Sequence, residues 1–380
     1  MPASRRAIAA VTVVLAAVAF TVVPSSGMAT ALSPGPVFTP ATVARAGTLP
    51  RVFVVGSAPC GSGLRCLQLW ESSTVAAGVP TTFTQRTMPV RIAPSPSLGP
   101  MVSLVFANQQ DGLFMTRSSF DDPTHVYATT DAGERWRPVD FGSSAVTTQL
   151  IASGNVFDAL LEHCTRISTG DCTGYTLARS VAGSTHWSFS AFPPHGVLRP
   201  PGASAAMGAA GSQLWITYLD PKTPVPQLAE STGGRPPRFT VFGQPRLAGV
   251  VACALAPMAG SVIWANCPTG MMVSELRSTD GGHGFTAVWS YAGTGGFAFD
   301  PVSAEIAFRY LGIESTAVER TTDGGQTFTG VGTLPFAQGS VTRLLFLDEA
   351  DGFALGSTSA GTAALLQTID GGSSWSPVSF

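Results

Sequence analysis

The sequence predicts an all-β protein in which seven four-stranded antiparallel sheets form a ring. Two observations carry this prediction: an eight-residue phrase recurs at a regular interval, and the composition suits short strands joined by turns. A period of about 40 to 50 residues around a tight turn is typical of a β-propeller, because a small twisted sheet buries both faces only by stacking against its neighbours.

The phrase occurs four times, as TTDAGERW from Thr129, STDGGHGF from Ser278, TTDGGQTF from Thr321 and TIDGGSSW from Thr368. Its aspartate can accept hydrogen bonds from the backbone amides of its own turn, and its glycine allows a positive φ. Its aromatic residue begins the next strand and is expected to pack between neighbouring sheets. The expected structural residues are Asp131, Gly133, Trp136, Asp280, Gly282, Phe285, Asp323, Gly325, Phe328, Asp370, Gly372 and Trp375.

Degenerate copies extend the repeat to seven. SVAGSTHW begins at Ser180, STGGRPPRF begins at Ser231, and a weaker trace begins at Ser72, so that successive repeat points lie 43 to 57 residues apart. Six blades remain the alternative if the Ser72 repeat is not a true blade. The predicted blades lie near residues 49–95, 100–142, 146–192, 203–243, 249–290, 294–334 and 340–380.

Composition supports this architecture and excludes one class of partner. Only 12% of the residues are charged, while Gly and Pro are abundant, which favours short strands and turns over surface helices. The formal net charge of -2 provides no basic surface for nucleic acid.

The first 31 residues have the layout of a secretory signal peptide. Arg5 and Arg6 precede an apolar run over residues 7–23, and Ala29-Thr30-Ala31 forms a small-residue cleavage site. An uncleaved membrane anchor is the alternative, and the choice between general and twin-arginine export stays open. Residues 32–48 form a Pro-rich leader that can lend one strand to close the ring, and residues 49–380 form a single propeller domain. We expect a secreted or cell-surface protein without stable membrane insertion after cleavage.

Six cysteines fall into three local pairs, Cys60 with Cys66, Cys164 with Cys172, and Cys253 with Cys267. Local disulfides are the simplest pairing, although six cysteines permit 15 connectivities. Each bridge is expected to contribute about 2 to 3 kcal/mol. Two of the pairs lie in blades with degenerate repeats, which suggests that a disulfide replaces the lost turn. No C-x-x-C occurs and the histidines are scattered, so neither a metal nor a cofactor is expected.

The repeated phrase resembles the Asp-box, or bacterial neuraminidase repeat, of sialidases, sortilin-like receptors and photosystem II assembly-factor-like propellers. Two further segments, VFANQQDGLF at 105–114 and LFLDEADGFA at 345–354, echo each other around a first hairpin turn. The resemblance spans the predicted propeller and implies that ligands approach the face opposite the repeated turns.

The sialidase resemblance also implies three arginines, a Tyr/Glu pair and an acidic catalyst. The nearest match to the family's F/Y-R-I-P motif is Val90-Arg91-Ile92-Ala93-Pro94, which lacks the aromatic residue and inserts Ala93. Tyr310, beside Arg309, is the best nucleophile candidate, although an aromatic residue within an inner strand is the favoured interpretation. We therefore assign no catalytic residue, and an exo-sialidase type of glycoside hydrolase is the alternative function.

Polar loops on the expected ligand face favour a binding function, because recognition residues concentrate on rigidly anchored loops. We expect a monomeric, non-catalytic binding or scaffold protein for an extracellular glycan or protein partner. The candidate ligand residues are Asp121, Asp122, His125, Arg166, Asp171, His195, Arg199, Asp220, Trp289 and Tyr291.

Overall fold

The computed structural model describes the chain from Phe38 to Phe380 with short gaps. The described residues exclude 48–49, 62–63, 77, 89–100, 118–123, 143–144, 167–170, 193–204, 220–224, 232–236, 248–251, 270–271, 293–297 and 313–314. The predicted signal peptide lies outside the described residues. No helix within the described residues has the length and apolar character that a bilayer crossing requires.

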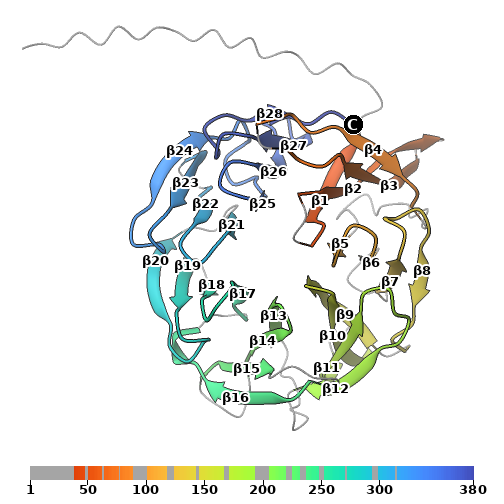
Figure 1. Ribbon diagram of the computed structural model, residues 1–380, viewed down its shortest axis with the longest axis vertical. Coiled ribbons are helices and arrows are strands. Elements are labelled where there is room, and N and C mark those ends of the chain that lie inside the picture. Colours follow the sequence, from red (N-terminus) through yellow and green to blue (C-terminus); the bar gives the residue numbers. More distant parts are fainter. Residues whose placement is uncertain are drawn as a thin grey trace, which may run out of the picture. The chain divides into compact units, whose positions relative to one another are not determined.

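Seven four-stranded antiparallel sheets form a ring, which confirms the predicted fold class and the count of seven blades (Figure 1). Each blade consists of four strands consecutive in sequence, with the first strand innermost. One 3-10 turn, Pro245–Leu247, is the helical element among the described residues.

The strands of the first four blades are β1 (Thr39–Arg45), β2 (Val52–Gly61), β3 (Leu64–Ser72), β4 (Phe83–Arg86); β5 (Met101–Phe106), β6 (Gly112–Arg117), β7 (His125–Thr129), β8 (Arg137–Val139); β9 (Ala145–Ser153), β10 (Val156–Arg166), β11 (Asp171–Val181), β12 (Ser188–Phe192); β13 (Ala205–Ala210), β14 (Gln213–Tyr218), β15 (Gln227–Ser231) and β16 (Phe239–Gly243).

The strands of the last three blades are β17 (Ala254–Pro257), β18 (Ile263–Thr269), β19 (Met272–Ser278), β20 (Thr286–Ala292); β21 (Ala298–Pro301), β22 (Ala307–Tyr310), β23 (Ala317–Thr321), β24 (Thr329–Thr333); β25 (Arg343–Phe346), β26 (Gly352–Ser357), β27 (Ala363–Thr368) and β28 (Ser376–Pro377).

Stacked aromatic rings join neighbouring blades and explain the F-x(5)-G spacing inside the two echoed segments. Phe106 stacks on Phe53 of the preceding blade, with ring centroids 3.7 Å apart. At the equivalent place in the last blade, Phe346 stacks on Phe308 at 3.5 Å. A Cβ on Gly112 would lie 2.5 Å from the Phe106 ring, so only glycine leaves room for the ring at the start of the second strand.

Among the strands that the structure describes, none is exchanged between the two ends of the ring. Strand β1 is the first strand of the first sheet, and its Val43 and Ala44 are buried between blades. The propeller therefore starts within residues 32–48 and not at residue 49. Blades 1 and 7 pack through an apolar cluster that includes Val43, Val52 and Phe353. The side-chain amide of Gln367 also bonds both the backbone N–H and the hydroxyl of Thr81.

Candidate functional site

The four repeated turns share one set of hydrogen bonds. In the turn that follows Thr129, the hydroxyl of Thr129 donates to Asp131 at 2.9 Å and accepts from the N–H of Gly133 at 2.9 Å. The same Asp131 oxygen accepts the N–H of Arg135 at 2.8 Å. The four turn glycines have φ values of 85°, 96°, 87° and 90°, at Gly133, Gly282, Gly325 and Gly372.

These bonds hold the turn carboxylates in the ionised state. For Asp323, the hydroxyl and N–H of Thr327 and the hydroxyl of Thr321 lower the pKa to about 2. At Asp131, desolvation opposes the shift, but hydrogen bonds from Arg135 N–H and the Thr129 hydroxyl still lower the pKa. A carboxylate held this way is a poor proton donor near neutral pH.

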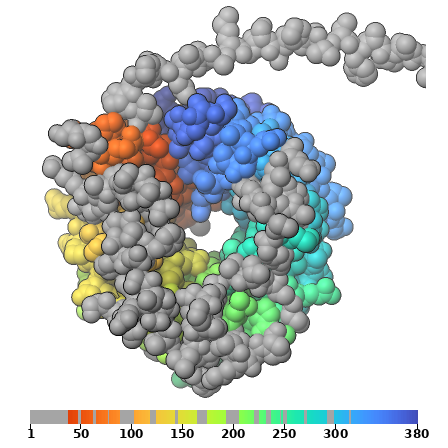
Figure 2. Space-filling model, turned by 180° about the vertical axis from the view of Figure 1, so that it is seen from behind, coloured from red at the N-terminus to blue at the C-terminus, as the bar shows by residue number. Residues whose placement is uncertain are grey.

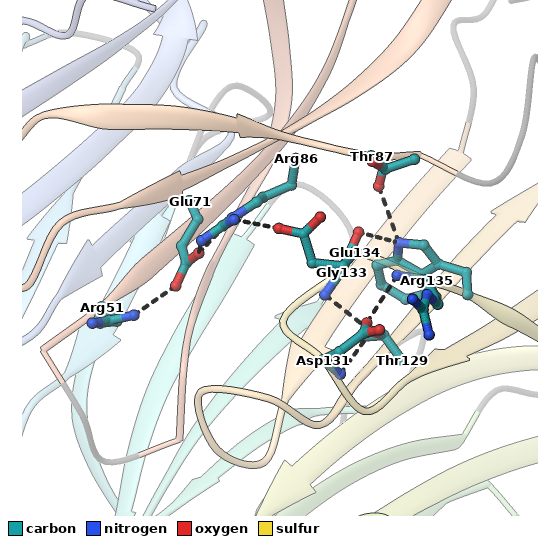
Figure 3. A network of polar contacts seen from close by, with 10 residues as sticks. Arg51, Glu71, Arg86, Thr87, Thr129, Asp131, Gly133, Glu134 and Arg135 are labelled. Carbon is teal, nitrogen blue, oxygen red and sulfur yellow. Dashed lines mark hydrogen bonds and ion pairs between the residues drawn. The ribbon is translucent and has the colours of Figure 1, made fainter.

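A chain of ion pairs ties the blade 2 turn to blade 1 (Figure 3). Glu71 is buried and accepts from Arg51 at 2.8 Å and from Arg86 at 2.7 Å. Arg86 also pairs with Glu134 within the turn. The indole N–H of Trp136 donates to the carbonyl oxygens of Gly133 and Thr87, which adds a second link between the two blades.

Two of the three predicted disulfides are present, Cys60–Cys66 and Cys253–Cys267. In the third pair, Cys164 and Cys172 lie directly opposite each other on strands β10 and β11, but the structure does not describe their side chains. Cys60–Cys66 joins β2 to β3 at the end of β3 away from Ser72, so this bridge does not lie at the degenerate turn.

For most residues of the predicted ligand face, the structure does not describe the side chain. Asp121, Asp122, His195, Arg199 and Asp220 fall in the gaps, and Arg166, Asp171 and Tyr291 lie in strands without described side chains. His125 is exposed and begins β7, where it lines a pocket.

Trp289 lies against a buried arginine between blades 5 and 6. The guanidinium carbon of Arg309 is 4.0 Å from the Trp289 ring centroid and 3.6 Å from that of Phe328. Arg309 pairs with Glu319 of its own blade at 2.7 Å and with Glu275 of blade 5 at 3.3 Å. Trp289 and Arg309 therefore belong to the packing of these two blades.

Burial raises the pKa of two titratable residues near Arg309, namely Glu275 and the nucleophile candidate Tyr310. Desolvation raises the pKa of Glu275 to about 7, although Arg309 opposes this shift. Tyr310 is fully buried in the core shared by blades 6 and 7, where burial also raises its pKa. Its hydroxyl is therefore not exposed to a ligand, in agreement with the favoured interpretation of Tyr310 as an inner-strand residue.

The centre of the ring is open, as Figure 2 shows. All seven innermost strands line this channel, whose volume is about 550 Å³. Its charged lining residues are Asp300 and Arg343. Desolvation raises the pKa of Asp300 to about 6, while the bond from Phe346 N–H and the charges of Arg343 and Arg45 oppose this shift. Asp300 thus holds the edge of the next blade's inner strand.

The junction of blades 2 and 3 contains two adjoining pockets, which share Pro138, Val139 and Asp140. We call the first the His125 pocket, with a volume of about 290 Å³. The second, the Arg135 groove, has a volume of about 590 Å³. The His125 pocket is lined by Thr124, His125, Val126, Tyr127, Pro138, Val139, Asp140, Phe141, Gly142, Ala145 and Thr147. The Arg135 groove is lined by Gln110, Asp111, Ala128, Thr130, Asp131, Arg135, Arg137, Pro138, Val139, Asp140, Gly183, Ser184, Thr185 and Trp187.

Sequence reasoning did not single out Arg135, Arg137 or Trp187 as ligand residues. A signal was available, because the other three intact repeats carry small or hydroxyl residues where blade 2 has the two arginines. The groove also lies beside the repeated turn, whereas the sequence analysis placed ligands on the opposite face.

The chain matches no family profile and no curated protein. Solved structures do resemble it. The structure of YCF48 bound to D1 peptide has a TM-score of 0.52 at 14% identity, covering 89% of this chain and 98% of that one. The β-propeller domain of the Trilobed protease from Pyrococcus furiosus, which has an open velcro topology, has a TM-score of 0.55 at 10% identity, covering 90% and 98%.

A puromycin hydrolase mutant complexed with PGG has a TM-score of 0.54 at 13% identity, covering 87% of this chain but only 53% of that chain. The present chain therefore spans about half of that enzyme. A Hadza microbial sialidase reaches a TM-score of 0.45, which supports no functional comparison. At these identities the likenesses show the fold alone: the chain is a seven-bladed, all-β propeller.

Proposed function

We propose that this protein is an exported, non-catalytic binding propeller that recognises an extracellular glycan or protein partner at the junction of blades 2 and 3. The observation that carries the proposal is the pair of adjoining pockets at this junction, where exposed His125, Arg135 and Arg137 lie beside partly exposed aromatic rings. Strands β7 and β8 hold His125 and Arg137, and the hydrogen-bonded turn between these strands holds Arg135, so the site is largely pre-formed.

The Asp131 carboxylate at the junction supports binding over hydrolysis. Asp131 accepts the N–H of Arg135, and Asp140 accepts the N–H of Gly142 at 2.8 Å. Asp111 accepts the side-chain amide of Asn108 at 2.7 Å. A glycosidase needs one carboxyl group with a raised pKa to protonate the leaving group. The pKa of Asp131 is lowered instead.

Export is supported by the signal-peptide pattern and by the two disulfides, which fit an extracellular protein. We assign the four repeated turns to the Asp-box type on their shared sequence and hydrogen bonds. The peptide complex of YCF48 supports recognition of a ligand by a propeller of this architecture.

The test combines a glycan array and a panel of extracellular proteins with a fluorogenic sialoside assay at several pH values. We expect binding without turnover. Turnover of the sialoside would replace the proposal with an enzyme, and absence of binding to every probe would overturn it. Mass spectrometry of the protein from culture medium should find Leu32 at the amino terminus, and an intact leader would contradict export with cleavage.

A further inference from the structure

The Arg135 groove runs between the repeated turn of blade 2 and the degenerate turn of blade 3. Asp131, Arg135 and Arg137 line one side, and Ser184 and Trp187 line the other. The turn of blade 2 is held within its own blade, because the N–H of Ala132 donates to the carbonyl of Gln110 at 2.9 Å. In blade 3, the N–H of Ala182 donates to the carbonyl of Asn155 at 3.0 Å, so both turns beside the groove are anchored.

The two arginines depart from the repeat at positions where the turn does not need them. Aligned with Arg135 and Arg137 are Gly284 and Thr286, Thr327 and Thr329, and Ser374 and Ser376. The bond that all four copies share at the first position comes from the backbone N–H, which donates to the aspartate at 2.8 to 3.0 Å and is available to any side chain there.

Arginine at the first position also gives up a bond that other copies make. The hydroxyls of Thr327 and Ser374 donate to Asp323 and Asp370, at 2.6 and 2.5 Å. The Arg135 side chain makes no such bond to Asp131 among the described contacts. Against desolvation, the charge of Arg135 adds to the hydrogen bonds that lower the pKa of Asp131. The presence of two exposed cations side by side, Arg135 and Arg137, is explained by recognition of a ligand.

Three aspartates and two arginines line the groove, which gives it a formal charge of -1, so a ligand carboxylate has its favourable partners at the two arginines. Its three aspartates, Asp111, Asp131 and Asp140, already accept local hydrogen bonds. Neither Arg135 nor Arg137 forms a salt bridge within the described part of the chain, and both are exposed. A guanidinium matches the geometry of a carboxylate through two parallel hydrogen bonds.

The remaining lining fits a sugar ring. Trp187 is half-buried and braced by Phe141, whose ring centroid lies 4.9 Å away at an interplanar angle of 86°. Its indole supplies apolar surface, while the hydroxyls of Ser184 and Thr185 can bond sugar hydroxyls. A volume of about 590 Å³ suits a small ligand or a short oligomer, whereas a protein interface is broad and buries about 800 Å² per partner.

We propose that the Arg135 groove binds a carboxylated saccharide of the uronic-acid type, with Arg135 and Arg137 on the carboxylate and Trp187 against the ring. This assignment rests on the proposed binding function and names its ligand class. It also places recognition on the same face as the repeated turns.

Isothermal titration of the purified protein with tetragalacturonate tests the assignment. The matched variant is Arg135→Ser with Arg137→Ser, which copies Ser374 and Ser376 of blade 7 and so retains a sequence that this turn accepts. The control is Arg238→Ser with Arg246→Ser, which removes two exposed charges elsewhere. We expect the affinity to fall at least tenfold in the groove variant and to stay within twofold in the control.

Two further probes separate carboxylate recognition from general charge attraction. The methyl ester of the same oligomer should bind the unmodified protein as weakly as tetragalacturonate binds the groove variant. A hexaglutamate peptide should bind at least tenfold more weakly than tetragalacturonate. If the methyl ester or hexaglutamate bound the unmodified protein as tightly as tetragalacturonate does, the assignment would be overturned. The same holds if the control variant lost as much affinity for tetragalacturonate as the groove variant.

Trp187→Phe provides a second readout. We expect its affinity for tetragalacturonate to fall threefold to tenfold while its melting temperature stays unchanged. Unchanged affinity would show that Trp187 does not contact the ligand. If the protein binds another glycan or a protein but no uronate, the groove assignment fails while the binding function stands. If no probe binds, both fail.

Discussion

Phe38 and Phe380 pack against each other across the seam of the ring, with ring centroids 4.5 Å apart. Phe380 also contacts Trp70 and Phe83, at centroid distances of 5.5 and 5.2 Å. Since none of the described strands is exchanged between the first and last blades, the propeller closes through these rings together with the buried apolar cluster on which they pack.

Phe380→Ala should therefore lower the free energy of unfolding by about 2 to 4 kcal/mol, since it removes a large ring from an apolar cluster. Denaturant titration measures this loss. Val241→Ala, at a residue that is 37% exposed, should change stability by less than about 0.5 kcal/mol. A loss at Phe380 no larger than at Val241 would show that the seam closes by other contacts.

Gly325→Ala should destabilise the protein by about 2 to 4 kcal/mol, because alanine is strained at a positive φ and its Cβ would clash with a neighbouring side chain. Gly325 has a φ of 87°, and its Cβ would lie 2.2 Å from Val288. Gly330→Ala is the matched control within the same blade, since it has open space and no positive φ. Equal melting temperatures for the two variants would contradict the role of Gly325 in the turn.

Ala132→Gly should raise stability by up to about 1 kcal/mol. Ala132 has a φ of 58°, the only positive φ at a non-glycine among the described residues, and the other copies have Gly281, Gly324 and Gly371 there. Relief of left-handed strain outweighs the added freedom of glycine in the unfolded chain. Thermal melting checks the direction, and a lower midpoint would show that Ala132 is unstrained.

Glu275→Gln should flatten the dependence of stability on pH. The folded-state pKa of Glu275, about 7, lies above the ordinary value of 4.5, so folding favours the protonated form. The wild-type protein should therefore lose on the order of 3 kcal/mol as pH rises from 4.5 through 7. Chemical denaturation at pH 5 and pH 8 measures the difference between the two proteins.

Glu305→Gln is the control, because Glu305 is exposed and pairs with Arg277 at the surface. It should leave the difference between pH 5 and pH 8 as it is in the wild type. A Glu275 variant with the same pH dependence as the wild type would show that Arg309 keeps Glu275 ionised throughout.

Replacing Cys253 and Cys267 by alanine should reduce stability by about 3 kcal/mol, since the bridge closes a loop with a sequence separation of 14 and both residues are fully buried. Replacing Cys60 and Cys66 by serine should reduce it less, because that separation is 6 and Cys60 is exposed. A larger loss for the Cys60 pair would contradict this dependence on loop length and burial.

The repeat predicted the architecture because the turn, its glycine and its aromatic residue lie within eight residues. Local hydrogen bonds, such as that from Thr321 to Asp323, depend on spacing along the chain and are readable in sequence. The strand β1 was harder to place, because it lies at the beginning of the first repeat unit and no turn phrase precedes it. Its buried valine and alanine identify it only once the blades are assembled.

The contacts between blades could not be predicted in the same way. Arg309 meets Glu275 across 34 positions of sequence, and Phe346 meets Asp300 across 46. Neither separation follows from strand periodicity, since each depends on how two sheets stack. The Arg135 groove was missed for a different reason. The aspartates of the repeat were given a structural role, and the residues beside them in sequence were therefore not considered as ligand residues.

The unbroken order of strands within each blade has a consequence for how the protein is assembled. Each sheet is complete as soon as its own stretch of chain is available, so the blades can form one after another, each docking onto the one before. The final event is the meeting of blade 7 with blade 1, and no segment needs to wait for a distant partner strand. The two ends of the propeller can therefore be joined at the seam by a linker, and the chain can be opened between two other blades. Such a circularly permuted protein should fold into the same ring, with blades 7 and 1 now covalently connected.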